Sequence, residues 1–238
     1  MKLATWNIGS LYKNYDDYII TVQNQIQNCN IDILCLQEFP NISSLFEKIY
    51  LCGNFNYHYF VECSPSHVFV GGNMGIAVFS KVPLKQVGIF KLQKPQITVT
   101  YHGHIETLHD KVFLAVETQF NKERYLIFSG HGFSFHRYGL DYRNDLFEFE
   151  YQPLDNILTQ IIQSQTYDHI IIGGDFNCED ATQYIPCLSN KFYDVFQNDA
   201  TRPSRRKTDA IFLQKETNYI KKEIFESNMD HFMLIIER

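Results

Sequence analysis

Short apolar runs rich in β-branched and aromatic residues recur along the chain and predict most of its strands. The runs of this character are Tyr57–Glu62, Gly75–Phe79, Ile97–Tyr101, Val112–Glu117 and Tyr125–Ser129. Apolar residues at helical spacing appear in two places. A first helix is predicted from about Tyr15 to Cys29. A second helix is predicted from Pro153, which suits a first turn, and its apolar stripe consists of Leu154, Ile157, Leu158, Ile161 and Ile162.

The order of these elements favours two sheets over one wound sheet. Helical patterns are missing between about residues 50 and 140, which breaks the strand–helix alternation of a purely parallel sheet. We expect an α/β sandwich, in which two mainly antiparallel or mixed sheets pack face to face with helices outside. The chain has 238 residues, no linker-like tract and no internal repeat, so we expect one domain over residues 1–238.

The net charge argues against one class of nucleic-acid binder. A formal charge of −6 at pH 7 does not suit a protein that holds a duplex on a broad basic face, because that binding rests on phosphate neutralisation. An enzyme with a local basic patch remains compatible with this charge. Some of the carboxylates could instead be ligands of a divalent cation, which would partly reverse the local sign.

The first residues and the cysteines bear on the compartment. Met1 and Lys2 lead directly into an apolar run, which leaves no room for a signal peptide. No apolar stretch approaches the roughly 20 residues that span a bilayer. The six cysteines lack zinc-type spacing and are predicted to be reduced thiols. We expect a cytoplasmic protein and a monomer, although a chain that had lost a signal peptide would carry the same pattern.

Polar residues stand at the ends of the apolar runs along the whole chain. Asn7, Glu38 and His131 each close a run, and Asp175-Phe176-Asn177 follows another. Asp209 opens an apolar run, and Asp230-His231 stand just before the last one. This recurrence predicts one polar site that is assembled from the whole length of the chain.

The segment Gly173–Asn177 follows a fully apolar strand. In an extended backbone Asp175 and Asn177 would point to one side and Phe176 to the other. The aspartate could then orient an attacking water, and the neutral amide could bind that water or a phosphate oxygen. An Asx turn after the strand is an equally good interpretation of the same residues.

Two residues near the start of the chain suit a hard cation. Mg²⁺ prefers carboxylate oxygen and keeps several waters, so Glu38 with help from Asn7 could supply the protein's share of its ligands. Taken singly, Glu38 could be a solvated strand end and Asn7 a turn former.

Histidines supply the remaining candidate chemistry. His131 lies between glycines, which allow the backbone to approach a ligand closely, and a protonated imidazole there could bind a phosphoryl oxygen. Asp209 could orient the imidazole of His231. The spacing of His102, His104 and His109 looks like an exposed hairpin rather than a metal site.

These residues carry a family resemblance. Trp6-Asn7, Leu36-Gln37-Glu38, Gly75–Ser80, His131, Gly174–Asn177, Asp209 and Asp230-His231 occur in an order that resembles the endonuclease/exonuclease/phosphatase superfamily, which includes deoxyribonuclease I. The resemblance covers nearly the whole chain. It implies a four-layer α/β sandwich and hydrolysis of a phosphoester that depends on Mg²⁺ or Mn²⁺.

The resemblance also implies a role for each residue. Glu38 would hold the metal, with Asn7 and Asp230 nearby. Asp175 and Asn177 would position the water and the phosphate. The residues expected to contact the scissile phosphate are His131 and His231, with His231 oriented by Asp209.

Two positions qualify the resemblance. The family usually has Ser before the terminal Asp-His, and this chain has Met229, which removes a hydroxyl near Asp230. The residue after the central strand is His131, as in branches similar to deoxyribonuclease I, sphingomyelinases and inositol phosphatases. Apurinic endonucleases carry Asn there, which makes that branch less favoured.

The substrate stays open between three interpretations. Arg137, Arg143, Arg205 and Arg206 could track nucleic-acid phosphates, with Tyr138 and Tyr142 stacking on bases, and this favours a nuclease or a DNA-end phosphodiesterase. A basic loop that is merely solvated explains the arginines equally well. Alternatively, Phe133 and Phe135 could meet a lipid surface or wall a pocket for a small phosphoester. A non-catalytic binding protein is the third interpretation, which the retained ionisable groups disfavour.

Overall fold

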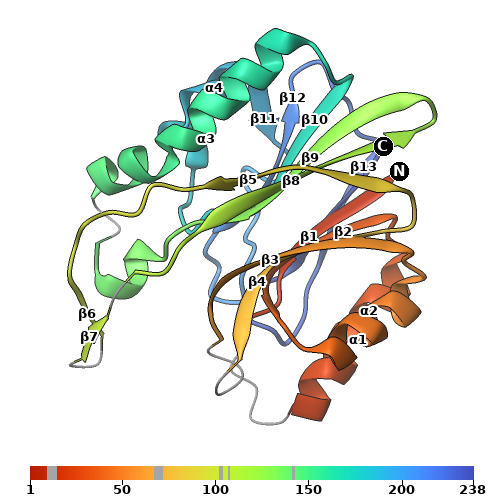
Figure 1. Cartoon of the computed structure of the whole chain (residues 1–238), viewed down its shortest axis with the longest axis horizontal. Coiled ribbons are helices and arrows are strands. Elements are labelled where there is room, and N and C mark those ends of the chain that lie inside the picture. The colour runs from red at the N-terminus through yellow and green to blue at the C-terminus, as the bar shows by residue number, and fades with distance from the viewer. Residues whose placement is uncertain (10–14, 67–71, 102–103, 107, 141–142) are drawn as a thin grey trace.

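Two six-stranded sheets pack face to face and carry helices on their outer faces (Figure 1). The computed structural model describes residues 1–9, 15–66, 72–101, 104–106, 108–140 and 143–238. The first sheet has the order β13-β14-β1-β2-β4-β3; its strands are β1 (Lys2–Asn7), β2 (Ile33–Pro40), β3 (Tyr57–Pro65), β4 (Asn73–Ser80), β13 (Lys221–Phe225) and β14 (Met233–Glu237). The second has the order β11-β12-β10-β9-β8-β5; its strands are β5 (Leu84–Lys91), β8 (Val112–Phe120), β9 (Glu123–His131), β10 (His169–Asp175), β11 (Phe192–Asp194) and β12 (Asp209–Gln214).

Helices cover both sheets, as Figure 1 shows. Helices α1 (Tyr15–Cys29) and α2 (Ser43–Gly53) lie on the first sheet, and α3 (Asn144–Ser164) and α4 (Pro186–Lys191) lie on the second. The short elements are the hairpin strands β6 (Val99–Tyr101) and β7 (His104–Glu106) and the 3₁₀ turns η1 (Phe135–Tyr138) and η2 (Ala181–Gln183).

Strand β2 shows why the chain forms these layers. Ile33 and Cys35 belong to the core between the sheets, and the alternating residues Leu34 and Leu36 belong to the core under α1 and α2. A strand that is buried on both faces must be apolar along its whole run. The predicted α/β sandwich is therefore confirmed, with four layers.

Most predicted elements are present. The first helix has the predicted bounds, and each predicted strand is found with its ends shifted by a few residues. Helix α2 and strand β5 were not predicted. Strand β5 lies at a sheet edge and has no fully buried residue, and its register shifts between Gln86 and Gly88, so its apolar pattern is weak.

The predicted start of the second helix is wrong. Helix α3 begins at Asn144, and Pro153 lies inside it. The first half of the helix buries Leu146, Phe147 and Tyr151, which are spaced to continue the stripe of the second half. Packing of these side chains offsets the hydrogen bond that an internal proline removes.

Strand register brings the predicted polar residues together. In parallel pairs, Asn7 of β1 lies opposite Gln37 of β2, and His131 of β9 lies opposite Asp175 of β10. Strand β12 runs antiparallel to β10, so its first residue, Asp209, is also opposite Asp175. The same edge of the sandwich thus receives the ends of some strands and the starts of others.

Candidate active site

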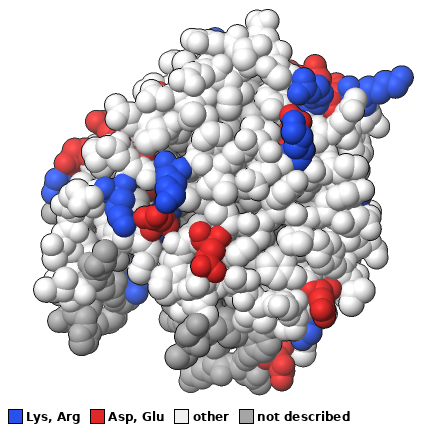
Figure 2. Space-filling model, in the orientation of Figure 1, with Lys and Arg blue, Asp and Glu red and all other residues white. Residues whose placement is uncertain are grey.

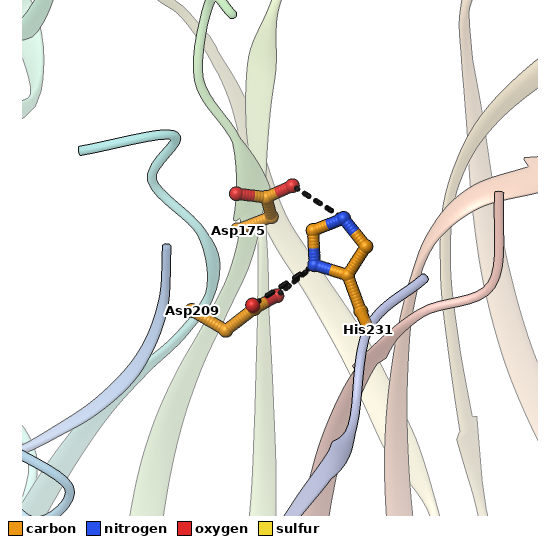
Figure 3. A group of neighbouring side chains, drawn as sticks. All are labelled: Asp175, Asp209 and His231. Carbon is orange, nitrogen blue, oxygen red and sulfur yellow. Dashed lines mark hydrogen bonds and ion pairs between the residues drawn. The ribbon is translucent and has the colours of Figure 1, made fainter. Parts of the chain in front are cut away.

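Three buried residues lie together at this edge, beneath a pocket that Asp175 and His231 line, and we call them the floor residues. They are Asp175, Asp209 and His231, whose exposed fractions are 1%, 1% and 4%. Figure 3 shows the two carboxylates on either side of the imidazole. Asp175 and Asp209 come from the second sheet, and His231 precedes β14 of the first. Both sheets must therefore be packed together before the floor exists.

Asp209 holds the imidazole of His231 in place. The Nδ1 atom of His231 lies 2.9 and 3.1 Å from the two carboxylate oxygens of Asp209. The hydroxyls of Thr201 and Thr208 donate to Oδ2 of Asp209 at 2.8 and 3.0 Å. The indole of Trp6 donates to the backbone oxygen of His231 at 3.0 Å. The other ring nitrogen, Nε2, therefore points away from Asp209 and lies 3.7 Å from Oδ2 of Asp175.

The two carboxylates keep His231 protonated at neutral pH. Burial alone would lower the pKa of His231, but Asp209 and Asp175 raise it to about 9. The imidazolium carries a hydrogen at Nε2 that a phosphate oxygen in the pocket could accept. This agrees with the phosphate contact expected for His231.

Asp175 ends β10 in an Asx turn. Its Oδ1 accepts from the backbone N–H of Asn177 at 2.8 Å, and Asn177 has a left-handed φ of 53°. The predicted extended backbone through Asn177 is therefore wrong, and the turn interpretation is confirmed. Both side chains nevertheless line one pocket, because the Asn177 amide donates to the Gly132 oxygen at 3.0 Å and is held beside Asp175.

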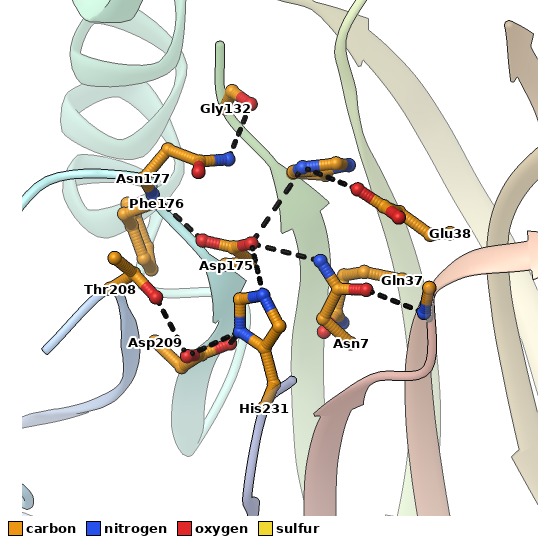
Figure 4. Close-up of polar contacts among 12 residues, drawn as sticks. Asn7, Gln37, Glu38, Gly132, Asp175, Phe176, Asn177, Thr208, Asp209 and His231 are labelled. Atoms are coloured by element: carbon orange, nitrogen blue, oxygen red, sulfur yellow. Dashed lines mark hydrogen bonds and ion pairs between the residues drawn. The ribbon is translucent and has the colours of Figure 1, made fainter. Parts of the chain in front are cut away.

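The environment of Asp175 suits a proton acceptor. Burial and the neighbouring Asp209 raise the pKa of Asp175 to about 6. The Nδ2 atom of Asn7 donates to its Oδ2 at 2.9 Å. This bond crosses from one sheet to the other, as Figure 4 shows. A carboxylate with a pKa near neutrality can hold or accept a proton from water.

Glu38 projects into the pocket from an irregular part of β2. The pairing with β4 shifts register between Leu36 and Phe39, and Glu38 has a φ of 52°. Its carboxylate lies 3.6 Å from Nε2 of His131. A Cβ atom at Gly9 would collide with that carboxylate, so glycine at this position leaves room for the Glu38 side chain in the pocket.

Lys111 belongs to the same site and was not predicted. Its Nζ lies 3.1 and 3.3 Å from Nδ1 and Nε2 of His131. Burial lowers the pKa of Lys111, and the charges of Glu38 and Asp175 oppose that effect. A signal was present in the sequence, because Lys111 precedes a strand that forms a hairpin with β9. The start of β8 must then lie beside the end of β9.

Glu150 supports the loop that follows His131. The residue is fully buried in α3, and its Oε1 accepts from the backbone N–H of Phe133 at 2.7 Å. Its Oε2 has no partner among the described residues. Burial raises the pKa of Glu150 well above its usual value. Burial thus favours the protonated form of this carboxyl group over the charged one.

The floor opens into a pocket of about 740 Å³. Its lining consists of Gly9, Glu38, Ser134, His136, Arg137, Asp175, Asn177, Arg202, Pro203, Asn228, Met229, Asp230 and His231. A second hollow of about 430 Å³ shares Glu38, Ser134 and Arg137 with it and reaches Lys111 and His109. The open space thus extends to both sides of Glu38.

The predicted substrate-binding arginines take different positions. Arg137 lines both hollows. We call Arg202–Lys207 the basic loop; within it Arg202 lines the pocket, Arg205 is exposed, and Arg206 borders a smaller hollow beside Asn177. Arg143 forms an ion pair with Asp145 at 2.7 Å and is not part of the pocket lining. On the face in Figure 2 acidic and basic side chains are interspersed rather than gathered in a basic field.

Asp230 and Met229 differ from the implied arrangement. The side chain of Asp230 is 56% exposed; it pairs with Arg202 and lies 3.9 Å from Nε2 of His231. Met229 is buried in the core of the first sheet and its helices. The hydroxyl of Ser227 accepts from the N–H of Met229 at 3.1 Å and donates to the His231 oxygen at 3.4 Å. A nearby hydroxyl therefore fixes the turn.

The aromatic and histidine motifs have outcomes of their own. Phe133 and Phe135 are buried in the core under α3, so the contact with a lipid surface is wrong, whereas Phe133 does line the second hollow. His109 is exposed and lines the second hollow. His102 and Tyr142 lie outside the described residues, and the side chain of His104 is not described. The cysteines are free thiols, as predicted.

The residues present fit a divalent cation. Asp175, Asp209 and His231 each offer a ligand atom within 4.8 Å of one another, but the imidazolium between the carboxylates already neutralises part of that group. Glu38 adds a further carboxylate at the pocket. The pKa of Asp175 is raised by burial first and by the charge of Asp209 second, and a bound cation would offset both effects. Asn7 uses its carbonyl oxygen to accept from Gly9 at 2.9 Å, so its contact with a cation stays a prediction.

Comparison with known proteins decides the family. Residues 4–208 match the sequence profile of the Endonuclease/Exonuclease/phosphatase family. The chain belongs to this family. Its members are hydrolases that act on phosphoesters and generally depend on divalent metals. The match ends one residue before Asp209, so the contact of Asp209 with His231 is independent support for the site. No curated protein sequence matches the chain significantly.

Solved structures show the family fold over the whole chain. The human nocturnin catalytic domain with a bound sulfate anion is 18% identical, with a TM-score of 0.70 and coverage of 99% of this chain and 93% of that one. Truncated TDP2 from Caenorhabditis elegans is 14% identical, with a TM-score of 0.69 and coverage of 99% and 95%. The mannosyl-6-phosphatase of Bacteroides thetaiotaomicron is 12% identical, with a TM-score of 0.67 and coverage of 100% and 98%.

The length and hydropathy of the helices can be compared with those of a membrane-spanning helix. Within the described ranges, none is both long and apolar enough to cross a bilayer. The cytoplasmic location and the monomeric state stay predictions.

Proposed function

We propose that this chain hydrolyses phosphodiester bonds with the help of Mg²⁺ or Mn²⁺, and that its substrate is a nucleic acid. The observation that carries the chemistry is the convergence of Asp175, Asp209 and His231. Asp175 and His231 line one pocket together with Glu38. These groups can activate water and neutralise a phosphate at the same place.

Each residue has a role that follows from its environment. Asp175 is ionised above about pH 6, so it accepts a proton from the attacking water or orients that water. Asn177 holds the water or a phosphate oxygen through its amide. His231, protonated and oriented by Asp209, donates from Nε2 to a phosphate oxygen, and His131 contacts the phosphate from the side of Glu38.

Positive charge comes from both the chain and the cation. The imidazolium of His231 offsets the negative charge that develops on the phosphate, and Lys111 lies beside His131 at the same site. Glu38 is our candidate ligand for the cation, with Asn7 and Asp230 nearby. A bound divalent cation would supply additional charge stabilisation at the phosphate and the leaving oxygen.

The shape of the pocket favours a diester. The two hollows meet at Glu38, Ser134 and Arg137, so a substrate can extend from the scissile phosphate in both directions. A phosphodiester has a group on each side of its phosphate, whereas a monoester has one. Arg137 and the basic loop are the groups that would follow a nucleic-acid backbone.

A small phosphorylated molecule is the second candidate. The pocket volume of about 740 Å³ lies within the range of small-molecule sites. A structural neighbour of the chain is named a mannosyl-6-phosphatase. A sphingomyelin or inositol-phosphate headgroup falls in the same class of substrate.

A substrate panel tests both candidates. Turnover would be measured with Mg²⁺ or Mn²⁺ on plasmid DNA, single-stranded DNA, RNA, a 5′-tyrosyl DNA end, sphingomyelin, inositol phosphates and mannose 6-phosphate. We expect a nucleic-acid substrate to be fastest, with activity that a chelator removes and added Mg²⁺ or Mn²⁺ restores. Chelator-resistant turnover would contradict the cation dependence. A clear preference for a small monoester would replace the first candidate with the second.

A further inference from the structure

Arg202 is the residue of the basic loop that points into the pocket. Its side chain is 15% exposed, whereas Arg205 in the same loop is exposed. Thr201, the residue before the loop, is tied to both sheets, because its hydroxyl donates to Asp209 at 2.8 Å and its carbonyl oxygen accepts from the Phe232 N–H at 2.8 Å. The backbone of Arg202 is thus fixed relative to His231.

One carboxylate oxygen lies between the side chains of Arg202 and His231. The Nη2 atom of Arg202 donates to Oδ2 of Asp230, and the same oxygen is 3.9 Å from Nε2 of His231. Asp209 holds Nδ1 of that imidazole, so Nε2 is the ring nitrogen on the side of Asp230. An oxygen placed between a guanidinium and an imidazole Nε2 occupies the position that a non-bridging phosphate oxygen would take.

Two further observations indicate that Asp230 is an exchangeable partner. Its side chain is 56% exposed, so its carboxylate can leave Arg202 and be solvated by water at a small cost in free energy. The guanidinium is not saturated by Asp230, because Nε of Arg202 is buried and has no acceptor among the described residues. A phosphate group can present two acceptor oxygens in the plane of the guanidinium fork, whereas Asp230 accepts from Arg202 through Oδ2 alone.

We propose that Arg202 is a specificity residue for the anionic phosphate and that Asp230 is its internal competitor. In the free protein Asp230 holds the guanidinium in the pocket. On binding, a phosphate oxygen takes the place of the Asp230 carboxylate between Arg202 and His231. This inference rests on the proposed function, and it assigns to Asp230 a role other than support of the metal.

Opposite effects of two substitutions test this exchange. Arg202→Gln removes the clamp, and we expect inorganic phosphate to bind about 10- to 100-fold more weakly. Asp230→Asn removes the competitor and retains the size of the side chain, so we expect phosphate to bind several-fold more tightly. Arg202→Lys keeps the charge without the planar fork and should fall between Arg202→Gln and the unchanged protein. Binding would be measured by calorimetry in the presence of a chelator, which removes any contribution from a cation.

A second ion pair provides the matched control. Arg124 and Glu117 lie 3.5 Å apart near the start of β9, at the opposite end of that strand from His131. Arg124→Gln and Glu117→Gln should leave phosphate binding unchanged. Unfolding midpoints of all five variants would be compared with that of the unchanged protein, so that a loss of folding is recognised.

The outcomes separate this inference from the proposed function. Unchanged phosphate binding in Arg202→Gln would overturn the inference. Weaker binding in both Arg202→Gln and Asp230→Asn would also overturn it, because Asp230 would then support the phosphate rather than compete with it. If no substrate in the panel is hydrolysed but phosphate binding shifts in opposite directions, the proposed function fails and the inference holds. On a hydrolysed substrate, KM should follow phosphate affinity, rising in Arg202→Gln and falling in Asp230→Asn.

Discussion

The floor of the pocket and its rim are built in different ways. The floor residues are almost fully buried, and each hydrogen-bonds to a neighbour that is itself fixed by a strand or by Thr201 and Thr208. The rim consists of Arg137 and the basic loop, where side chains range from half-buried Arg202 to exposed Arg205. Burial fixes the charge and the orientation of the floor side chains. The rim side chains lie in loops and contact solvent, so they can change conformation more easily.

The difference separates chemistry from selection. Groups that must change charge along a reaction benefit from a rigid, water-poor setting. Groups that track a substrate backbone act mostly through charge at longer range and are weakened by salt. We therefore expect the floor to control the turnover rate and the rim to control substrate affinity and salt dependence.

The largest expected effect is at the floor. Asp175→Asn and His231→Ala should each reduce kcat by on the order of 10³-fold or more, because each removes a group that acts in the transition state. Turnover on the best substrate of the panel would be measured together with the unfolding midpoint. Asp145→Asn changes an exposed carboxylate on α3 and serves as the control. Near-normal kcat in either floor variant would contradict the assignment.

The pH dependence should report the same two residues. The active form has Asp175 ionised and His231 protonated. The pKa is about 6 for Asp175 and about 9 for His231. We therefore expect kcat/KM to rise as the pH increases through about 6 and to fall as it increases through about 9. A cation bound nearby favours the carboxylate and would move the acidic limb to lower pH. A rate that is flat from about pH 5 to about pH 10, which brackets both values, would be incompatible with these roles.

A smaller effect is expected at the rim. Arg205→Gln together with Arg206→Gln should raise KM for plasmid DNA several-fold and reduce its salt dependence, since two phosphate contacts would be lost. The value of kcat and turnover of a small phosphoester should stay constant. KM would be measured at two or more salt concentrations. If plasmid cleavage is unchanged at every salt concentration, the nucleic-acid interpretation loses its local support.

The smallest effect is expected at Glu150, whose carboxyl group accepts from the backbone N–H of Phe133 in the loop leading to Arg137. Because burial raises the pKa of Glu150 well above 4.5, the folded protein binds its proton more tightly than the unfolded chain. The stability from this group is complete below pH 4.5 and is lost as pH rises toward the folded pKa. In the unchanged protein this decline amounts to about 1 kcal/mol of unfolding free energy per pH unit. Glutamine has no proton to lose, so Glu150→Gln should flatten the decline.

Urea unfolding at several pH values would measure the Glu150 effect. Glu148→Gln provides the matched control, because Glu148 is an exposed carboxylate on the same helix. A decline in unfolding free energy that persists unchanged in Glu150→Gln would show that the slope comes from other groups.

The sequence predicted the polar residues at strand ends more readily than the buried residues that support them. Asn7, Glu38, His131 and Asp175 stand at strand ends, and strand period and register determine where such residues meet. Lys111 and Glu150 were missed because their roles depend on which elements pack against them. An acid in the middle of a helix gives no sequence signal that its side chain is buried under a loop.

Loop and helix boundaries limited the prediction in a similar way. Proline suggested a helix start, but aromatic packing before Pro153 extends α3 by nearly half its length. Arg205 and Arg202 are alike in sequence, and only the tertiary position of the basic loop distinguishes an exposed arginine from one that lines the pocket. The alternating polarity of a strand carries information that a loop lacks.

The pairing of β1 with β14 has a consequence for the newborn chain. Trp6 and His231, which are joined by a hydrogen bond, are 225 residues apart, and a ribosome releases one long before the other. Until β14 emerges, β1 lacks its antiparallel neighbour and the carboxylates of Asp175 and Asp209 lack their imidazole. Under the proposed function, a nascent polypeptide would therefore gain activity only after β14 has paired with β1.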